Sequence, residues 1–194
     1  MEITSAQLKE LRDYTGISVM QCKKALEEAG GDMEKAKIIL QKKGGEIALK
    51  KSDRELGAGA IGSYVHSTNE VAALVQLSCE TDFVAKNVEF IALAREIAMH
   101  VAAQNPLYIN RAEVDEAALS KAKEVFMEEV KDKPQEMQEK ILAGKLDAYF
   151  KDRILLEQPF IKDADKSISD LLNTAIQKFG ENVVITAMSR ISIK

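Results

Sequence analysis

The hydrophobic period changes along this chain, and that change limits the possible folds more than any other sequence feature. Over residues 1–45 the apolar side chains recur three or four positions apart, which is typical of helices with one buried face. From Ile61 to His66, and again from Val71 to Cys79, they alternate at every second position, which is typical of strands. Turn residues at 67–69 separate the two runs, so we expect an antiparallel hairpin. A hairpin with helices before and after it predicts an α+β fold with a small antiparallel sheet.

The N-terminal segment carries start and stop signals for three short helices. Thr4 and Ser18, each followed three residues later by a glutamine, match the capping-box pattern, and Asp32 is a favourable N-cap residue. Gly30-Gly31 and Gly44-Gly45 are expected to end the second and third helices, because glycine readily adopts the left-handed conformation that follows a helix. The second helix is expected to bury Val19, Cys22, Ala25, Leu26 and Ala29.

These signals predict a three-helix domain over residues 1–45, followed by a charged connector over residues 46–57. A domain this small has a marginal core of its own, and such units usually serve to bind something. The charged stretch 41–57 is compatible with a solvated helix or with a flexible tether.

Residues 58–194 are expected to form the α+β core. Helices are predicted over residues 88–103, over 114–152 as a helical hairpin interrupted at Lys131–Pro134, and from Ser167 to Gly180. The last segment predicts a strand that places Val183, Ile185, Ala187, Ile191 and Ile193 on one face. A sheet of so few strands leaves its edges open, which favours self-association through an edge.

Charge and composition narrow the classes of function. The chain has 27 Lys and Arg against 31 Asp and Glu, and this net charge of −4 argues against a nucleic-acid partner. There is neither an apolar run long enough to span a membrane nor a secretion signal at the start, so we expect a cytoplasmic protein. Cys22 and Cys79 are expected to be buried thiols, and two histidines are too few for a multi-histidine metal centre.

Sequence motifs for catalysis or nucleotide binding are weak. The string Gly57-x-Gly59-x-x-Gly62 matches the dinucleotide fingerprint, but that loop must follow a strand and open a helix, whereas here it leads into a strand. The chain contains no phosphate-binding P-loop motif and no recognised nucleophile motif. We therefore expect no direct nucleotide binding, no cofactor or metal, and no bond-making chemistry.

The segment between the hairpin and the next helix is the strongest candidate site. It comprises Thr81, Asp82, Phe83, Val84, Ala85, Lys86 and Asn87, and it is expected to form a loop or a single turn at the end of the sheet. In one interpretation Asp82 caps a helix and Phe83 covers the core. In the other, Phe83 is an aromatic plug beside a carboxylate, suited to insertion into another protein.

The run CETDFVAKN, from Cys79 to Asn87, resembles the signature of the bacterial elongation factor Ts family. Other segments similar to the family are Leu8–Arg12, Thr15-Gly16, Cys22–Leu26, Gly62–His66, Ala98–Ala102 and Gln158–Phe160. The resemblance implies a ubiquitin-associated-like (UBA-like) three-helix domain at the N-terminus and a guanine-nucleotide exchange activity toward elongation factor Tu.

The same resemblance implies roles for particular residues. Phe83 would wedge into the GTPase near its magnesium site, while Asp82 would disturb the groups that hold the water shell of the ion. Lys23 and His66 correspond to further GTPase-contact positions, although His66 is equally compatible with a partly buried strand histidine.

Two departures from the longer family members concern the oligomeric state. Those members carry two copies of the sheet-and-helix subdomain, whereas this chain has room for one, which implies a short form that acts as a homodimer. Some short members have a cysteine near the C-terminal strand, and here Ser189 lies in that neighbourhood, so the dimer is expected to form without a disulfide. The alternatives to an exchange factor are a UBA-like adaptor and an RNA-binding protein.

Overall fold

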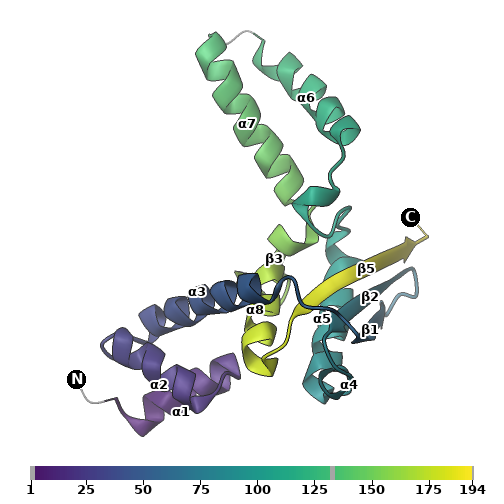
Figure 1. Cartoon of the computed structure of the whole chain (residues 1–194). Coiled ribbons are helices and arrows are strands. Elements are labelled where there is room, and N and C mark those ends of the chain that lie inside the picture. Colours follow the sequence, from purple (N-terminus) through teal and green to yellow (C-terminus); the bar gives the residue numbers. More distant parts are fainter. Residues whose placement is uncertain (1–2, 132–133, 194) are drawn as a thin grey trace.

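The predicted α+β class is confirmed. The computed structural model describes residues 3–131 and 134–193, and these residues combine helices with small antiparallel sheets (Figure 1). The predicted break at Lys131–Pro134 includes residues 132–133, which lie outside the described residues.

Three helices form the N-terminal part: α1 (Ser5–Thr15), α2 (Val19–Glu28) and α3 (Met33–Lys51). Thr4 forms the predicted capping box, because its hydroxyl accepts the Gln7 N–H at 3.2 Å while the Gln7 side chain accepts the Thr4 N–H at 3.0 Å. The helices bury a small apolar cluster that consists of Leu11, Ile17, Cys22, Ala25, Leu26, Ala36 and Leu40.

The expectation that Gly44-Gly45 end the third helix is wrong, since α3 continues to Lys51. Neither glycine has a positive φ, so neither adopts the left-handed conformation of a helix end. Gly44 instead allows α3 to lie close to α8 (Ile168–Phe179), since a Cβ at this position would approach the Asn173 carbonyl oxygen to 3.2 Å. The first part of the charged stretch is therefore helical.

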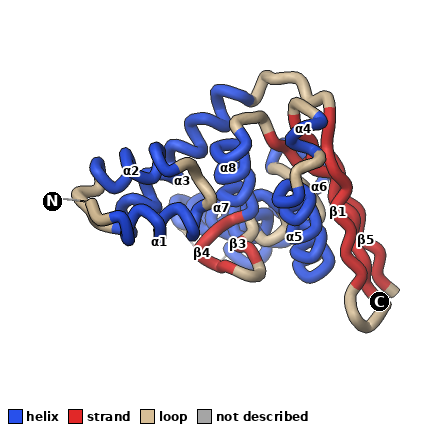
Figure 2. The backbone as a smooth tube through the Cα atoms, turned by 90° about the horizontal axis from the view of Figure 1, so that it is seen from below, coloured by secondary structure: helices blue, strands red, loops and turns tan. Residues whose placement is uncertain are grey.

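The main sheet has the strand order β1-β2-β5 within the described residues, and both pairings are antiparallel. Its strands are β1 (Ala58–Val65), β2 (Val71–Cys79) and β5 (Val183–Ser192). Helix α5 (Val88–Gln104) packs on one face, where a Cβ at Gly62 would meet the Ala94 carbonyl carbon and oxygen at 2.1 Å. In the view of Figure 2 the described helices lie to one side of this sheet, and none of them covers the other face, which is called the bare face below.

The predicted face of the last strand is wrong beyond its third residue. The register between β2 and β5 shifts between Gln76 and Leu77, so one extra residue, Thr186, stands between Ile185 and Ala187. Because such a bulge reverses the alternation of side chains, Val183 and Ile185 are buried, while Ile191 and Ile193 are 70% and 76% exposed. Arg190 takes the inner face instead and donates a hydrogen bond to the Ala102 carbonyl of α5 at 3.0 Å.

The predicted helical hairpin is confirmed as α6 (Glu116–Val130) and α7 (Gln135–Lys151), which project together from the body (Figure 1). Aromatic side chains pack at its base, where the rings of Phe126 and Tyr149 meet edge to face at 5.5 Å. Arg111, in the 3₁₀ turn η1 (Arg111–Glu113), pairs with Glu157 at 2.6 Å and with Asp147 of α7 at 2.8 Å. These contacts attach the hairpin to the core.

A two-stranded sheet, β3 (Pro159–Phe160) and β4 (Asp163–Ser167), was absent from the expectations, because neither segment has an apolar alternation. It precedes α8, whose predicted cap is confirmed: Ser167 and Asp170 form a capping box, and Gly180 ends the helix with φ of 73°.

Candidate functional site

The candidate segment forms a short turn at the end of the main sheet. Helix α4 (Asp82–Ala85) follows β2 directly, and Thr81 is its N-cap, with its hydroxyl accepting the Val84 N–H at 3.5 Å. Val84 and Ala85 are buried in the main core and anchor the turn. Asn87 is half-buried and caps α5 by accepting the Glu89 N–H at 2.8 Å. The turn is therefore fixed at both ends by packing and by caps.

Phe83 points away from this anchored base and is 84% exposed. The interpretation of Phe83 as a cover for the core is therefore wrong, and Thr81 rather than Asp82 is the cap. The first residue of α5, Val88, is also 79% exposed. Exposed aromatic and aliphatic side chains on a rigid segment favour contact with another protein.

Asp82, the residue directly before Phe83, carries an exposed carboxylate. Its carboxylate pairs with Lys86 one turn later at 2.6 Å, and both side chains are about three-quarters exposed, at 74% and 77%. The hydrogen bond from Lys86 holds the pKa of Asp82 below its ordinary value. An exposed pair of this kind contributes little to stability, so separating Asp82 from Lys86 costs the fold little.

The residue before the turn ties it to the neighbouring strand. Glu80 accepts the Asn182 N–H at 2.6 Å and pairs with Arg54 at 3.2 Å. The Asn182 N–H and the Arg54 guanidinium both lower the pKa of Glu80, with the larger effect from Asn182.

His66 lies at the opposite end of the sheet from Phe83, because it follows β1 whereas the turn follows β2. The eight paired residues of these strands separate the two ends by roughly 25 Å. His66 is exposed and hydrogen-bonds to the Tyr64 hydroxyl at 3.1 Å through Nδ1, so the interpretation as a partly buried histidine is wrong.

Lys23 is on α2, and its side chain is 61% exposed and lies 3.9 Å from Glu27. Beside it on the same helix, Val19 is 46% exposed and Met20 is 69% exposed. The prediction of a buried Val19 is wrong, because the side chain of the first helical residue points back past the start of the helix. The exposed pair next to Lys23 is an apolar surface that the hydrophobic period alone did not reveal.

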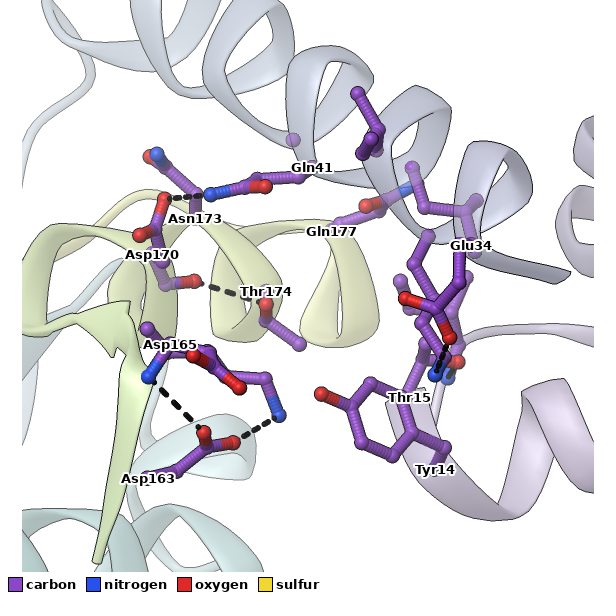
Figure 3. Close-up of a pocket in the computed structure, with 16 residues that line it drawn as sticks. Tyr14, Thr15, Glu34, Gln41, Asp163, Asp165, Asp170, Asn173, Thr174 and Gln177 are labelled. Atoms are coloured by element: carbon purple, nitrogen blue, oxygen red, sulfur yellow. Dashed lines mark hydrogen bonds and ion pairs between the residues drawn. The ribbon is translucent and has the colours of Figure 1, made fainter. Parts of the chain in front are cut away.

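A cavity of about 550 Å³ separates the N-terminal helices from β4 and α8 (Figure 3). Its polar side chains bond to one another across the gap: Gln41 of α3 donates to Asp170 at 2.7 Å. The Tyr14 ring lies 4.5 Å from the Lys37 ammonium and 4.0 Å from that of Lys166. These contacts hold the N-terminal helices against the core, and the sequence offered no signal for them.

Within residues 3–131 and 134–193, no three His, Cys, Asp or Glu side chains are grouped so as to hold a metal ion. Cys22 and Cys79 are both buried and free, as predicted, and burial raises the pKa of each thiol. None of the described helices combines the length and the apolar composition that crossing a membrane requires.

The fold is an α+β scaffold that presents a bare aromatic ring beside a charged carboxylate, and such a site is typical of proteins that act by docking on another protein. A model of the family described as elongation factor Ts matches residues 4–193. The chain is 45% identical over 194 residues to elongation factor Ts of Thermodesulfovibrio yellowstonii, an alignment that covers 100% of this chain and 97% of that protein. It is 46% identical over 193 residues to elongation factor Ts of Thermosipho melanesiensis, covering 98% of each chain.

A third relative, elongation factor Ts of Thermotoga maritima, is 45% identical over 193 residues, covering 100% of this chain and 97% of that protein. The chain therefore belongs to the elongation factor Ts family, and its role is that of a translation elongation factor.

Proposed function

We propose that this chain is a guanine-nucleotide exchange factor that binds elongation factor Tu with GDP bound and accelerates release of the GDP. The observation that carries the proposal is the anchored turn on which Phe83 is 84% exposed. The family resemblance of the run from Cys79 to Asn87 supplies the identity of the partner.

In the proposed mechanism, Phe83 enters the GTPase near its magnesium site, and Asp82 turns from Lys86 toward the groups that hold the water shell of the ion. GTPases of this kind hold nucleotide through magnesium and through loop amides, so disturbing either weakens the phosphate contacts. A loss of ~3 kcal/mol would accelerate release by roughly two orders of magnitude if the whole loss lowers the barrier. By linkage, rebinding nucleotide weakens the factor's own affinity by the same ratio.

This activity requires no bond-making chemistry, no cofactor and no direct nucleotide binding by the chain itself. Translation places the protein in the cytoplasm with its GTPase partner. In this proposal the three N-terminal helices, expected over residues 1–45 and extended to Lys51 by α3, form a UBA-like binding domain. Lys23 and the exposed Val19 and Met20 are its contact with the partner. Thr81, Lys86 and Asn87, together with His66, complete the proposed contact surface with elongation factor Tu. Val84 and Ala85, which were also expected to contact the partner, are buried in the core and anchor the turn instead.

We also propose that the protein is a homodimer without a disulfide. The bare face of the main sheet exposes Ile61, Val65, Leu74, Ile191 and Ile193. Several exposed apolar side chains on one face of a sheet are typical of a protein interface, and a second copy would bury them sheet to sheet. The structure thus favours association through the face of the sheet rather than through its edge.

The direct test is stopped-flow release of a fluorescent GDP analogue from elongation factor Tu. We expect the protein to accelerate release by roughly two orders of magnitude at saturation. A release rate that does not change with added protein would contradict the exchange function.

A further inference from the structure

The start of β5 and the end of β2 meet at one end of the main sheet. Cys79, the last residue of β2, pairs with Val183, the first residue of β5, in an antiparallel register. The residues that follow β2 therefore lie beside the residues that precede β5, although about a hundred positions separate them in sequence. Glu181 stands in the turn before β5, next to the candidate segment.

The Glu181 carboxylate binds three donors, two from the first residue of that segment and one from the residue before it. One oxygen accepts the backbone N–H of Glu80 at 3.1 Å and that of Thr81 at 3.0 Å. The other accepts the Thr81 hydroxyl at 2.6 Å. In the reverse direction, Glu80 accepts the Asn182 N–H at 2.6 Å. The segment after β2 and the segment before β5 are thus joined by reciprocal hydrogen bonds. The carboxylate of Glu181 accepts backbone N–H groups of the first segment, and the carboxylate of Glu80 accepts one of the second.

These bonds act on the residues immediately before Asp82 and Phe83. The Thr81 hydroxyl that donates to Glu181 also receives the Val84 N–H, so Glu181 fixes the N-cap of α4. Val84 and Ala85 hold the later half of the turn in the core, whereas its first half has Glu181 and Glu80 as its attachments to β5. The direction in which the Phe83 ring leaves the protein is therefore set jointly by core packing and by this carboxylate.

We propose that Glu181 is a positioning residue for nucleotide exchange, which holds the turn so that Phe83 and Asp82 are presented to the GTPase in one orientation. This inference rests on the proposed exchange function and extends it to a residue outside the run from Cys79 to Asn87. A group that orients a reactive contact without touching the partner lowers the cost of ordering it on docking.

A double-mutant cycle between Glu181 and Phe83 tests the inference, with stopped-flow GDP release from elongation factor Tu as the readout. We expect Glu181→Ala to lower the acceleration roughly tenfold, in line with the sensitivity of such sites to small displacements. In a Phe83→Ala background the same change should alter the rate clearly less than it does in the wild type, because only Asp82 is then left to position. The amide protons of Glu80 and Thr81 should exchange faster with solvent in Glu181→Ala.

Two further variants separate positioning from folding. Glu113→Ala is the matched control, because Glu113 also accepts a backbone N–H, that of Ile109 at 2.7 Å, but at the base of the helical hairpin; its exchange rate should equal that of the wild type. Glu181→Gln keeps an acceptor for both amides and can donate to the Thr81 hydroxyl, so it should remain within about threefold of the wild type.

The inference is overturned if Glu181→Ala accelerates GDP release as strongly as the wild type does. It is also overturned if Glu181→Ala lowers the release rate by an equal factor in the Phe83→Ala background, or if Glu181→Gln accelerates release as weakly as Glu181→Ala. In each case the wild type still accelerates release, so the proposed function survives. A wild type that fails to accelerate release would instead defeat the proposed function, and amide exchange at Thr81 would still report whether Glu181 holds the turn.

Discussion

Phe83 is an aromatic residue whose side chain would ordinarily be buried, but here the ring is exposed. Burial of an aromatic ring of this size stabilises a fold by about 1.5–3 kcal/mol, and four of the nearby apolar residues, Val84, Ala85, Phe90 and Cys79, are buried. Phe83 is left out of this core because α4 turns it outward while the next two residues, Val84 and Ala85, point into the core.

We predict that Phe83→Ala lowers the acceleration of GDP release at least tenfold, since the ring is the part of the turn that enters the partner. Its melting temperature should match that of the wild type, because a ring that is 84% exposed contributes little to the core. Stopped-flow release and thermal unfolding measure the two effects. Val125→Ala, at an apolar position of α6 that is 57% exposed, is the control for general loss of apolar surface. Full activity of Phe83→Ala would contradict the wedge.

His100 is a buried group, and its burial favours the neutral form of the imidazole. Its Nε2 bonds to the Gln158 side-chain oxygen at 2.9 Å, and its Nδ1 accepts the Ile161 N–H at 3.3 Å. The Gln158 amide donates to the Asp152 carbonyl at 2.6 Å, which leaves its oxygen as the acceptor and assigns the proton to Nε2. Burial lowers the pKa of His100 from its ordinary value of 6.5.

This lowered pKa predicts a pH dependence of stability. Above pH 6.5 the imidazole is neutral in both states, and its full contribution is present; as the pH falls below 6.5 the unfolded chain takes up a proton that the folded protein excludes. Stability should therefore fall toward the folded-state pKa, by at most about 1.4 kcal/mol per pH unit from this group. Urea unfolding at pH 5.5 and 7.5 measures the slope. His100→Gln should show a shallower slope than the wild type, and equal slopes would refute the assignment.

At the scale of elements, glycines decide how closely helices approach their neighbours. Gly62 has no room for a side chain, because a Cβ would meet the Ala94 carbonyl of α5 at 2.1 Å. Gly144, in the middle of α7, has open space around the same position and has no positive φ. Gly62 is in a strand and Gly144 is in a helix, and the structure around each decides whether a methyl group would fit there.

Gly62→Ala and Gly144→Ala should therefore change stability in opposite directions. We expect Gly62→Ala to destabilise the protein by about 1–3 kcal/mol or more, because α5 must move away from β1. Gly144→Ala should stabilise it by about 0.5–1 kcal/mol, through the higher helix propensity of alanine. Chemical denaturation measures both, and a neutral Gly62→Ala would show that α5 does not lie against β1 as described.

Local sequence patterns predicted most of the helices and strands correctly. The errors have a common cause, which is contact with elements that are distant in sequence. The capping boxes at Thr4 and Ser167 and the alternation in β2 were predictable, because each depends on residues a few positions apart. The continuation of α3 through Gly44 and the bulge at Thr186 were not, because they depend on α8 and on β2. The candidate turn was likewise predictable as a segment, whereas its attachment to Glu181 joins residues far apart in the chain.

At the scale of the whole molecule, the bare face of the sheet predicts a dimer that one charge can disrupt. Leu74, on the central strand, is 49% exposed on that face, and its neighbours across the sheet are Ser63 and Ser189. We expect the wild type to elute with a mass near twice 21.4 kDa, and Leu74→Lys to elute near 21.4 kDa, because a buried lysine without a partner is costly. Size exclusion with light scattering measures both masses.

The matched control for the dimer is Leu49→Lys, since Leu49 is 78% exposed on α3, away from the sheet. It should keep the mass of the wild type. A monomeric wild type, or a Leu74→Lys protein that remains dimeric, would show that the sheet face is not the interface.

The sequence alone determined the α+β class, the succession of helices and strands, and the segment that holds the candidate site, because these depend on hydrophobic periods and caps that operate over a few residues. Only the tertiary structure decided which side chains of that segment face solvent, which face of β5 is buried, and how the turn is held, since each of these depends on atoms brought together from distant parts of the chain. Glu181 illustrates the difference: nothing near it in sequence marks it, and its position becomes meaningful only when β5 pairs with β2.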